Sequence, residues 1–159
     1  METTAYIAVG SNKGDRRLNI MQAIKLLEKE IYLLRISSFI PTPPEEGVKG
    51  GGFFNGVLSA RTSMTSDRLF RFLQSVEQSL GRSMPREKGE ERSIDLDLIF
   101  YGTEVSDRPG LTVPHPRYSG RYFVVQPLLE IAPKIRDPKN GAYVADLQVE
   151  TRNEGNQDN

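Results

Sequence analysis

Two aspartates, Asp95 and Asp97, are the residues of this sequence best suited to chemistry. They lie in segment 93–101, where apolar and other residues alternate, and this alternation predicts a strand. Residues two apart on a strand project from the same face, so the two carboxylates can converge on one site. Such a pair can hold one or two magnesium ions against a polyphosphate. A polar, solvent-facing strand edge would give the same pattern, and the pair alone does not separate the two interpretations.

Basic residues precede this strand, interleaved with glutamates so that the formal charges of the segment cancel. They are Arg82, Arg86, Lys88 and Arg92. Guanidinium groups suit bidentate phosphate contacts, and a charged segment without periodicity suits a lid that closes on a ligand. A solvated loop is the ordinary explanation of such a run. The position directly before the aspartates favours the phosphate-binding interpretation.

The only histidine, His115, lies between Pro114 and Pro116. Prolines on both sides restrict the backbone and hold the imidazole in one direction, which suits a donor to phosphate better than a general base. A lone histidine is more often structural. Arg117 and Arg121 follow closely and can add positive charge to the same site.

A third group of residues combines aromatic rings with polar side chains. Two aromatic planes can sandwich a flat heterocycle, while an asparagine amide supplies a donor and an acceptor to its edge. Each residue alone would be ordinary core or turn material, and only the combination predicts a site for a planar ring. The residues are Thr42, Pro43, Phe53, Phe54, Asn55 and Phe123.

Composition limits the classes of function. The 159 residues include 21 Lys and Arg against 21 Asp and Glu, so the formal net charge is zero, which argues against nucleic-acid binding by bulk charge. Without cysteine there is no disulfide, thiolate zinc site or cysteine nucleophile, and the remaining ligands favour hard cations such as magnesium. No window is apolar enough for a membrane helix and the start lacks a signal-peptide layout, so we expect a cytoplasmic protein that does not bind membranes.

The predicted elements form one domain, residues 1–147, followed by a disordered tail at 148–159. Their order predicts an α+β fold with a ferredoxin-like βαββαβ core, an antiparallel sheet backed by two helices. We expect strands at 3–9, 32–40, 53–60 and 93–101, a loop at 41–52, helices capped by Asp15 and by Thr65 or Ser66, a helix end at Gly81, a short strand at 111–113 and a weak helix at 124–131.

Two apolar patterns predict which residues face the core. The first helix presents Leu18, Met21, Ile24, Leu27 and Ile31 as one stripe, and the second presents Leu69, Phe72, Leu73, Val76 and Leu80. In the last strand, the alternation predicts Ile94, Leu96, Leu98 and Phe100 on one face and Asp95, Asp97, Ile99 and Tyr101 on the other.

The chain resembles the 6-hydroxymethyl-7,8-dihydropterin pyrophosphokinase family of folate biosynthesis. The motifs that carry the resemblance run in order over about residues 5–133: AYIAVGSNKGD, SSFIPTPP, FFNGV, VEQSLGR, RSIDLDLIFYG, LTVPHP and PLLEIAP. The resemblance implies transfer of a pyrophosphoryl group from ATP to the pterin hydroxymethyl oxygen, with AMP as the other product. It also implies a three-layer α/β/α build, two magnesium ions and a cytoplasmic enzyme, which we expect to be a monomer.

The same resemblance implies roles for individual residues. Metal ligands are Asp95 and Asp97, and the catalytic residues are these two with Arg82, Arg92 and Arg121. The ATP-binding residues are Gln74, Glu77, Arg82, Arg86, Lys88, Arg92, Thr112 and His115. The pterin-binding residues are Thr42, Pro43, Phe54, Asn55, Asp95 and Phe123. Two other classes stay open: a non-catalytic binding domain of ferredoxin-like fold, and another metal-dependent nucleotidyl or phosphoryl transferase.

Overall fold

The computed structural model describes residues 1–43, 52–81 and 93–147. The predicted tail, the basic segment 82–92 and most of the predicted loop at 41–52 lie outside the described residues. The elements are β1 (Thr3–Ser11), α1 (Arg16–Glu28), β2 (Tyr32–Ile36), β3 (Ile40–Thr42), β4 (Phe53–Thr62), α2 (Ser66–Ser79), β5 (Asp95–Tyr101), β6 (Ser106–Arg108), β7 (Leu111–Val113), the 3-10 helix η1 (Tyr118–Gly120) and α3 (Tyr122–Ile131).

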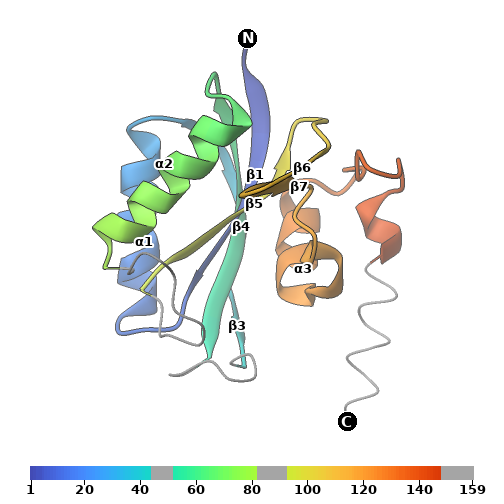
Figure 1. The fold of residues 1–159 in the computed structure, drawn as a ribbon. Coiled ribbons are helices and arrows are strands. Elements are labelled where there is room, and N and C mark those ends of the chain that lie inside the picture. The colour runs from blue at the N-terminus through green and yellow to red at the C-terminus, as the bar shows by residue number, and fades with distance from the viewer. Residues whose placement is uncertain (44–51, 82–92, 148–159) are drawn as a thin grey trace.

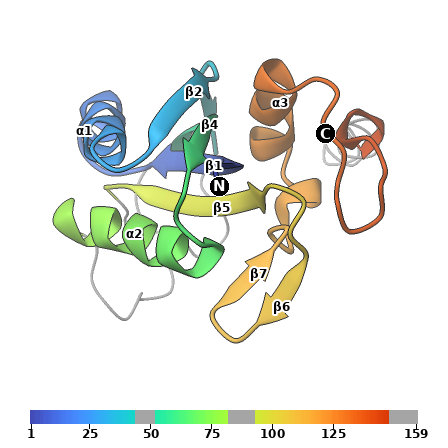
Figure 2. The same cartoon turned by 90° about the horizontal axis from the view of Figure 1, so that it is seen from above.

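The main sheet is antiparallel and has the strand order β2-β4-β1-β5, with the short β3 paired to the start of β4. Helices α1 and α2 cover one face and α3 covers the other, so the molecule has three layers (Figures 1 and 2). The hairpin β6–β7 forms a separate two-stranded sheet. The predicted α+β fold with a βαββαβ core is confirmed.

Each face of the sheet has its own apolar core. Burial of a large aliphatic side chain contributes about 1.5–3 kcal/mol, so both layers contribute to holding the strands in register. The core under α1 and α2 includes Ala5, Ile7, Val9, Leu27, Leu58, Ala60, Leu69, Leu73, Leu96 and Leu98. The core under α3 includes Val57, Ile99, Phe100, Tyr118, Val124, Val125 and Leu128.

Both predicted helix starts are confirmed by side-chain caps. A carboxylate oxygen of Asp15 accepts the backbone N–H of Leu18 at 3.1 Å, and the Thr65 hydroxyl accepts that of Arg68 at 3.2 Å. Helix α2 ends before Gly81, whose φ of +99° lies in the left-handed region that glycine adopts without strain.

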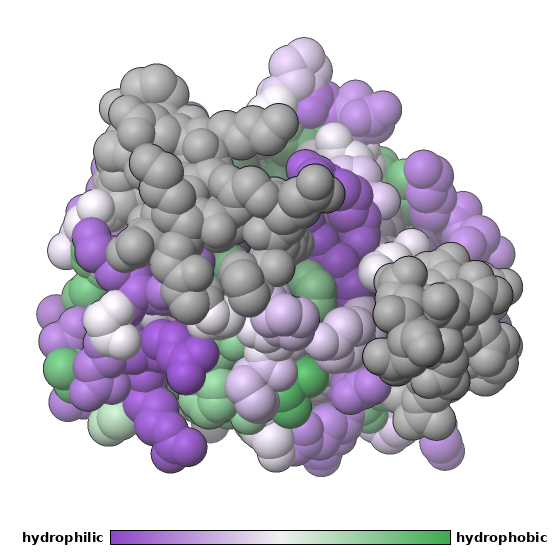
Figure 3. Space-filling model, turned by 90° about the horizontal axis from the view of Figure 1, so that it is seen from below, coloured by the Kyte–Doolittle hydropathy of each residue, from purple (hydrophilic) through white to green (hydrophobic). Residues whose placement is uncertain are grey.

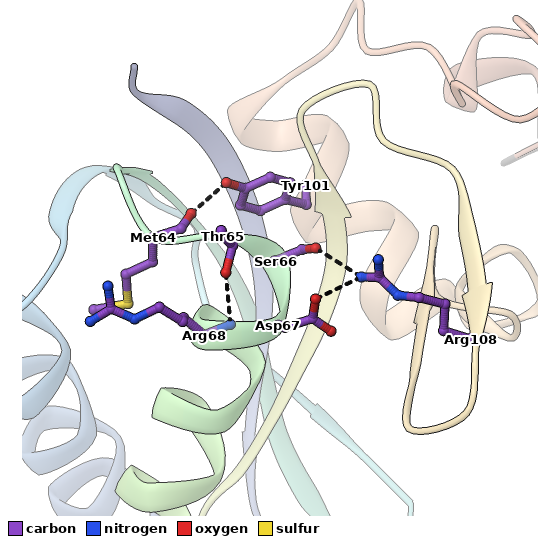
Figure 4. A network of polar contacts seen from close by, with 7 residues as sticks. All are labelled: Met64, Thr65, Ser66, Asp67, Arg68, Tyr101 and Arg108. Atoms are coloured by element: carbon purple, nitrogen blue, oxygen red, sulfur yellow. Dashed lines mark hydrogen bonds and ion pairs between the residues drawn. The ribbon is translucent and has the colours of Figure 1, made fainter.

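Polar contacts join the start of α2 to β5 and β6 (Figure 4). The Tyr101 hydroxyl, at the end of β5, donates to the carbonyl of Met64. Arg108 in β6 donates to the Asp67 carboxylate at 3.0 Å and to the Ser66 hydroxyl at 3.4 Å. The helix start and the strand that carries the aspartates are therefore tied at one end.

The predicted apolar stripe of the first helix is wrong at two positions. Leu18 and Met21 are 49% and 57% exposed, whereas Ile20, Ala23 and Leu27 are buried. At 100° per residue, Leu18 lies about 200° around the helix axis from Ile20, so the two cannot face the sheet together. The side of the helix that meets the sheet is centred on Ala23 and Leu27.

The predicted alternation in β5 is wrong after Leu98. The register with β1 shifts between Tyr6 and Ile7, so that Ile7 pairs with Leu98 and Tyr6 pairs with Phe100. Ile99 is the extra residue of this bulge. As a result, Phe100 packs under α3 together with Ile99 instead of joining Leu96 and Leu98 in the other core.

The segment predicted as one strand at 32–40 is two strands. β2 and β3 both pair with β4, but the ladder is interrupted between them. Ser37 donates its backbone N–H to the Val57 carbonyl at 2.9 Å, and its side-chain hydroxyl accepts the Val57 N–H at 2.8 Å. Thr42, predicted in a loop, ends β3. The first strand also runs two residues beyond the predicted 3–9, and α3 begins two residues before the predicted 124 despite containing Pro127.

A substitution at Gly56 can test how Phe39, between β2 and β3, packs against β4. A β-carbon added to Gly56 would lie 2.7 Å from the Phe39 ring, which is too close for either group to stay in place. We expect Gly56→Ala to lower the free energy of unfolding by about 1–3 kcal/mol, measured by urea denaturation. The same change made in a Phe39→Leu background should cost clearly less, and an equal cost in both backgrounds would contradict this packing.

Candidate active site

The centre of the site is a row of three residues on neighbouring strands. Gly10 of β1 pairs with Asn55 of β4 on one side and with Asp95 of β5 on the other. Directly paired residues of antiparallel strands share a face, so Asn55 and Asp95 flank the glycine. A β-carbon on Gly10 would lie 2.8 Å from the Asn55 side-chain oxygen, so only glycine fits here without displacing that amide.

Asp97 lies beside this row, next to a cation from the opposite layer. It pairs with Ala8, and its carboxylate is 4.0 Å from the guanidinium of Arg121. Arg121 stands at the junction of η1 and α3, and the side chains of Arg121 and Asp97 are only 21% and 24% exposed. The predicted convergence of Asp95, Asp97 and Arg121 is therefore consistent with the geometry of the sheet and α3.

His115 is held beside β5 by its backbone N–H, which donates to the Ile99 carbonyl at 2.9 Å. Burial, reinforced by the positive charges of Arg121 and Arg117 and opposed by Asp95, lowers the pKa of His115 to about 4. Its Nδ1 accepts the Arg117 backbone N–H at 3.1 Å, so in the neutral ring the proton is on Nε2. At neutral pH His115 can thus donate one hydrogen bond without carrying a charge.

The polar residues of the predicted ring-binding group are brought together. The Asn55 side-chain amide donates to the Thr42 hydroxyl at 2.7 Å. Phe53 lies on the same face, since it pairs with Thr42 and its ring is 3.4 Å from a β-carbon placed on Gly10. Asn55, Thr42 and Phe53 therefore form one wall next to Asp95.

Phe54, in contrast, points to the other face of the sheet. Its ring stacks on Phe39 with centroids 5.6 Å apart, and the guanidinium carbons of Arg16 and Arg17 lie 5.8 and 5.4 Å from its centre. The structure does not bring Phe54 together with the aspartates, because adjacent strand residues face opposite ways. Phe53, two positions from Asn55, lies on the face that carries the aspartates.

The segment between β2 and β3 is fixed to α3. Both carboxylate oxygens of Glu130 accept the Ser38 backbone N–H, at 3.0 and 3.1 Å, and one also accepts the Ser38 hydroxyl at 2.8 Å. This contact joins residues 92 positions apart in the chain. It holds the start of the segment that leads to Thr42.

The predicted ATP-binding residues are spread over several elements. Glu77 on α2 is 1% exposed and accepts the Leu96 N–H at 2.9 Å, so its carboxylate joins α2 to β5. Gln74 is half-buried almost one turn earlier on α2. The hydroxyl of Thr112 donates to Asp107 at 3.1 Å within the β6–β7 hairpin.

Other predicted site residues lie at the margins of this arrangement. Pro43 is exposed directly after β3, and Phe123 is half-buried on α3 with its ring centre 5.9 Å from the Arg121 guanidinium carbon. The predicted phosphate-binding residues Arg82, Arg86, Lys88 and Arg92 lie outside the described residues.

The donor set fits magnesium better than a metal that needs an all-protein cage. Within residues 1–43, 52–81 and 93–147, no cluster of three or more His, Cys, Asp or Glu side chains could hold a metal ion. Two partly exposed carboxylates on one strand face, Asp95 and Asp97, suit magnesium, which commonly takes one or two carboxylates plus water and substrate phosphates.

None of the described helices has the length and apolar character needed to cross a membrane. Seen from below, the described residues are largely hydrophilic with small hydrophobic patches between them (Figure 3).

A protein-family model matches most of the chain. The model of the 7,8-dihydro-6-hydroxymethylpterin-pyrophosphokinase (HPPK) family matches residues 6–133. The 2-amino-4-hydroxy-6-hydroxymethyldihydropteridine pyrophosphokinase of Aquifex aeolicus is 38% identical over 135 residues, covering 85% of this chain and 84% of the relative. The protein of the same name from Bacillus subtilis is 34% identical over 144 residues, covering 89% and 86%.

Other relatives are much longer than this chain. The folic acid synthesis protein fol1 of Pneumocystis carinii is 38% identical over 141 residues, and the chain spans 19% of its length. A crystal structure of HPPK-DHPS in complex with substrates superposes with a TM-score of 0.77 at 13% identity, covering 98% of this chain and 44% of the other. Wild-type HPPK-DHPS of Plasmodium falciparum gives a TM-score of 0.71 at 12% identity, covering 94% and 45%. These two likenesses establish the fold.

The low pKa of His115 makes stability depend on pH. Between pH 6.5 and about pH 4 the unfolded chain binds a proton at this position that the folded chain does not, so stability falls as pH falls through this window. In the His115→Gln variant, we expect the urea midpoint to lose the part of its pH dependence that His115 causes between pH 6.5 and about pH 4. Because His115 is the only histidine, its ring resonances can be titrated directly by NMR, and an observed pKa near 6.5 would contradict the prediction.

Proposed function

Because the chain belongs to the 7,8-dihydro-6-hydroxymethylpterin-pyrophosphokinase family, we propose that it transfers a pyrophosphoryl group from ATP to 6-hydroxymethyl-7,8-dihydropterin. The hydroxymethyl oxygen forms a bond to the β-phosphorus of ATP, and the bond from that phosphorus to the oxygen bridging the α-phosphate breaks. The hydroxyl proton passes to water, and AMP leaves with the electron pair of the broken bond. The observation that carries the proposal is the placement of Asp95 beside Asn55 across Gly10, with Asp97 next to Arg121.

Asp95 and Asp97 are the proposed ligands of two magnesium ions. When bound, these ions would supply charge neutralisation around the triphosphate. The protein presents both carboxylates from one face of β5. Asp97 pairs with Ala8 of β1, which lies between β4 and β5 in the sheet. Rigid presentation avoids reorganisation as charge shifts during transfer.

Cations and neutral donors complete the proposed phosphate site. Arg121 would contact the transferring group, and its guanidinium 4.0 Å from the Asp97 carboxylate supports this role. His115 would donate its Nε2 proton to a phosphate oxygen while remaining uncharged. By the family resemblance, Arg82, Arg86, Lys88 and Arg92 would also bind phosphate. Gln74 and Thr112 would border the ATP site, whereas the buried Glu77 serves to position β5.

The pterin is proposed to bind against the wall formed by Asn55, Thr42 and Phe53. The Asn55 amide uses one N–H on the Thr42 hydroxyl, which leaves its oxygen and second N–H to pair with the edge of a heterocycle. We propose Phe53, in place of the Phe54 that the resemblance implied, as one aromatic plane that stacks on the pterin. Phe123 is the candidate for the opposite plane. Asp95 and Pro43 stand at the ends of this wall.

The proposal predicts a selective loss of catalysis when either aspartate is neutralised. We expect Asp95→Asn and Asp97→Asn each to lower AMP formation from ATP and the hydroxymethyl dihydropterin by about 100-fold or more, because a preorganised charge is removed. Thermal melts should stay close to wild type, and Asp146→Asn, an exposed aspartate after α3, serves as the matched control. Near-normal AMP formation in both variants would refute the assignment. ADP or pyrophosphate as the wild-type product would indicate a different transferase.

The two phenylalanines allow a direct test of the pterin wall. We expect Phe53→Leu to raise the KM for the pterin about fivefold to tenfold, since an aromatic stacking partner contributes about 0.5–1.5 kcal/mol. Phe54→Leu should leave that KM nearly unchanged and should lower the melting temperature instead, because Phe54 packs on Phe39. A raised KM in Phe54→Leu together with an unchanged KM in Phe53→Leu would indicate that Phe54, and not Phe53, contacts the pterin.

A further inference from the structure

A hollow that is open to solvent lies on the α3 side of the sheet, where β1 and β2 meet the chain that follows α3. Its volume is about 460 Å³. β2 and α3 lie next to one another in Figure 2, and the Ser38–Glu130 contact described above joins their ends. The hollow is lined by Tyr6, Arg35, Ile131, Pro133, Lys134 and Ile135, together with Ala132.

The wall of this hollow is mainly aliphatic. Ile131 ends α3, and Pro133 and Ile135 follow it, so three apolar side chains come from one short segment. Ile131 and Ile135 also contact the core under α3, which fixes the wall to the fold. An apolar ligand body would gain from covering these groups, as in most small-molecule sites.

The rim of the hollow carries positive charge and a phenol. Arg35 from β2 and Lys134 from the segment after α3 form no ion pair with any part of the chain that the structure describes. Burial raises the pKa of Tyr6 while Arg35 opposes the rise, so the phenol stays protonated and able to donate. Its hydroxyl has no hydrogen-bond partner among the described residues.

No acidic residue lines the hollow. The nearest carboxylate along the chain, that of Glu130, already accepts three hydrogen bonds from Ser38. Two cations and one phenol donor above an aliphatic wall match a ligand with one anionic end and an apolar body. A nucleotide would leave its many polar groups against the aliphatic wall without partners, which disfavours it.

This hollow is separate from the candidate active site. Arg121 precedes α3 and contacts Asp97, whereas the hollow follows the other end of the helix. A ten-residue helix is about 15 Å long. The hollow and the candidate active site therefore lie at opposite ends of α3, and ligand binding in the hollow can be measured without any substrate of the proposed reaction.

We propose that the hollow lined by Tyr6, Arg35 and Lys134 is a second ligand site, which binds a small organic anion with an apolar body, such as an aromatic monocarboxylate. The carboxylate pairs with Arg35 and Lys134 and accepts from the Tyr6 hydroxyl, while the ring covers Ile131, Pro133 and Ile135. Nothing in the proposed pyrophosphoryl transfer uses these residues.

The test is a titration of the 159-residue chain with sodium benzoate, followed by NMR of the backbone amides. We expect saturable shifts at Tyr6, Arg35, Lys134 and Ile135. Benzamide, which lacks the charge, and acetate, which lacks the ring, should each bind at least tenfold more weakly. No substrate or turnover is involved, so the outcome is independent of the proposed catalytic function.

Matched variants decide between this site and general charge attraction. Arg35→Gln combined with Lys134→Gln should weaken benzoate binding at least tenfold, whereas Lys25→Gln combined with Lys139→Gln removes the same charge elsewhere and should leave it unchanged. All four replaced residues are exposed, and thermal melts verify folding. Equal weakening in both double variants, shifts that do not saturate, or shifts confined to the active site around Asp95 and Asp97 would overturn the proposal.

Discussion

The antiparallel register of β1 with its two neighbours is the constraint on which the site depends. At one level of the sheet, Asn55, Gly10 and Asp95 stand side by side, so the residues on either side of Gly10 have α-carbons about 10 Å apart. A slip of β5 by one residue would turn Asp95 and Asp97 into the core under α1 and α2. Apolar burial on both faces of the sheet, with Leu96 on one side and Ile99 on the other, makes such a slip costly.

Charge in the site is balanced locally, which gives the zero net charge of the chain a physical meaning. The Asp97 side chain is three-quarters buried, and the Arg121 guanidinium 4.0 Å away offsets the energetic cost of burying its charge. His115 stands near the same arginine and avoids a further positive charge by remaining neutral. The proposed binding of a polyphosphate can rest on a few local groups, and it does not require an excess of basic residues over the whole chain.

The order of elements and their caps could be predicted from sequence, because Asp15, Thr65 and Gly81 act through local backbone geometry. The errors arose where tertiary packing decides. Periodicity alone could not tell which side of α1 meets the sheet, so Leu18 was placed inward. The bulge at Ile99 depends on pairing with β1, 90 residues away in the chain, and is invisible in the alternation itself. The sequence analysis named both Phe53 and Phe54 for a ring site, and only Phe53 shares a face with Asn55, because adjacent strand residues face opposite ways.

Helix α3 explains how two halves of the candidate site keep their relative position. Arg121, at its start, contacts β5 through Asp97, while Glu130, near its end, holds Ser38 and so the approach to β3. The helix persists around Pro127, which donates no backbone hydrogen bond, because that proline is buried against the sheet together with its neighbours. Tertiary packing therefore fixes α3 more than helix propensity does. A displacement of this helix would move both Arg121 and Ser38, so α3 maintains the alignment of the residues proposed to bind phosphate with those proposed to bind the pterin.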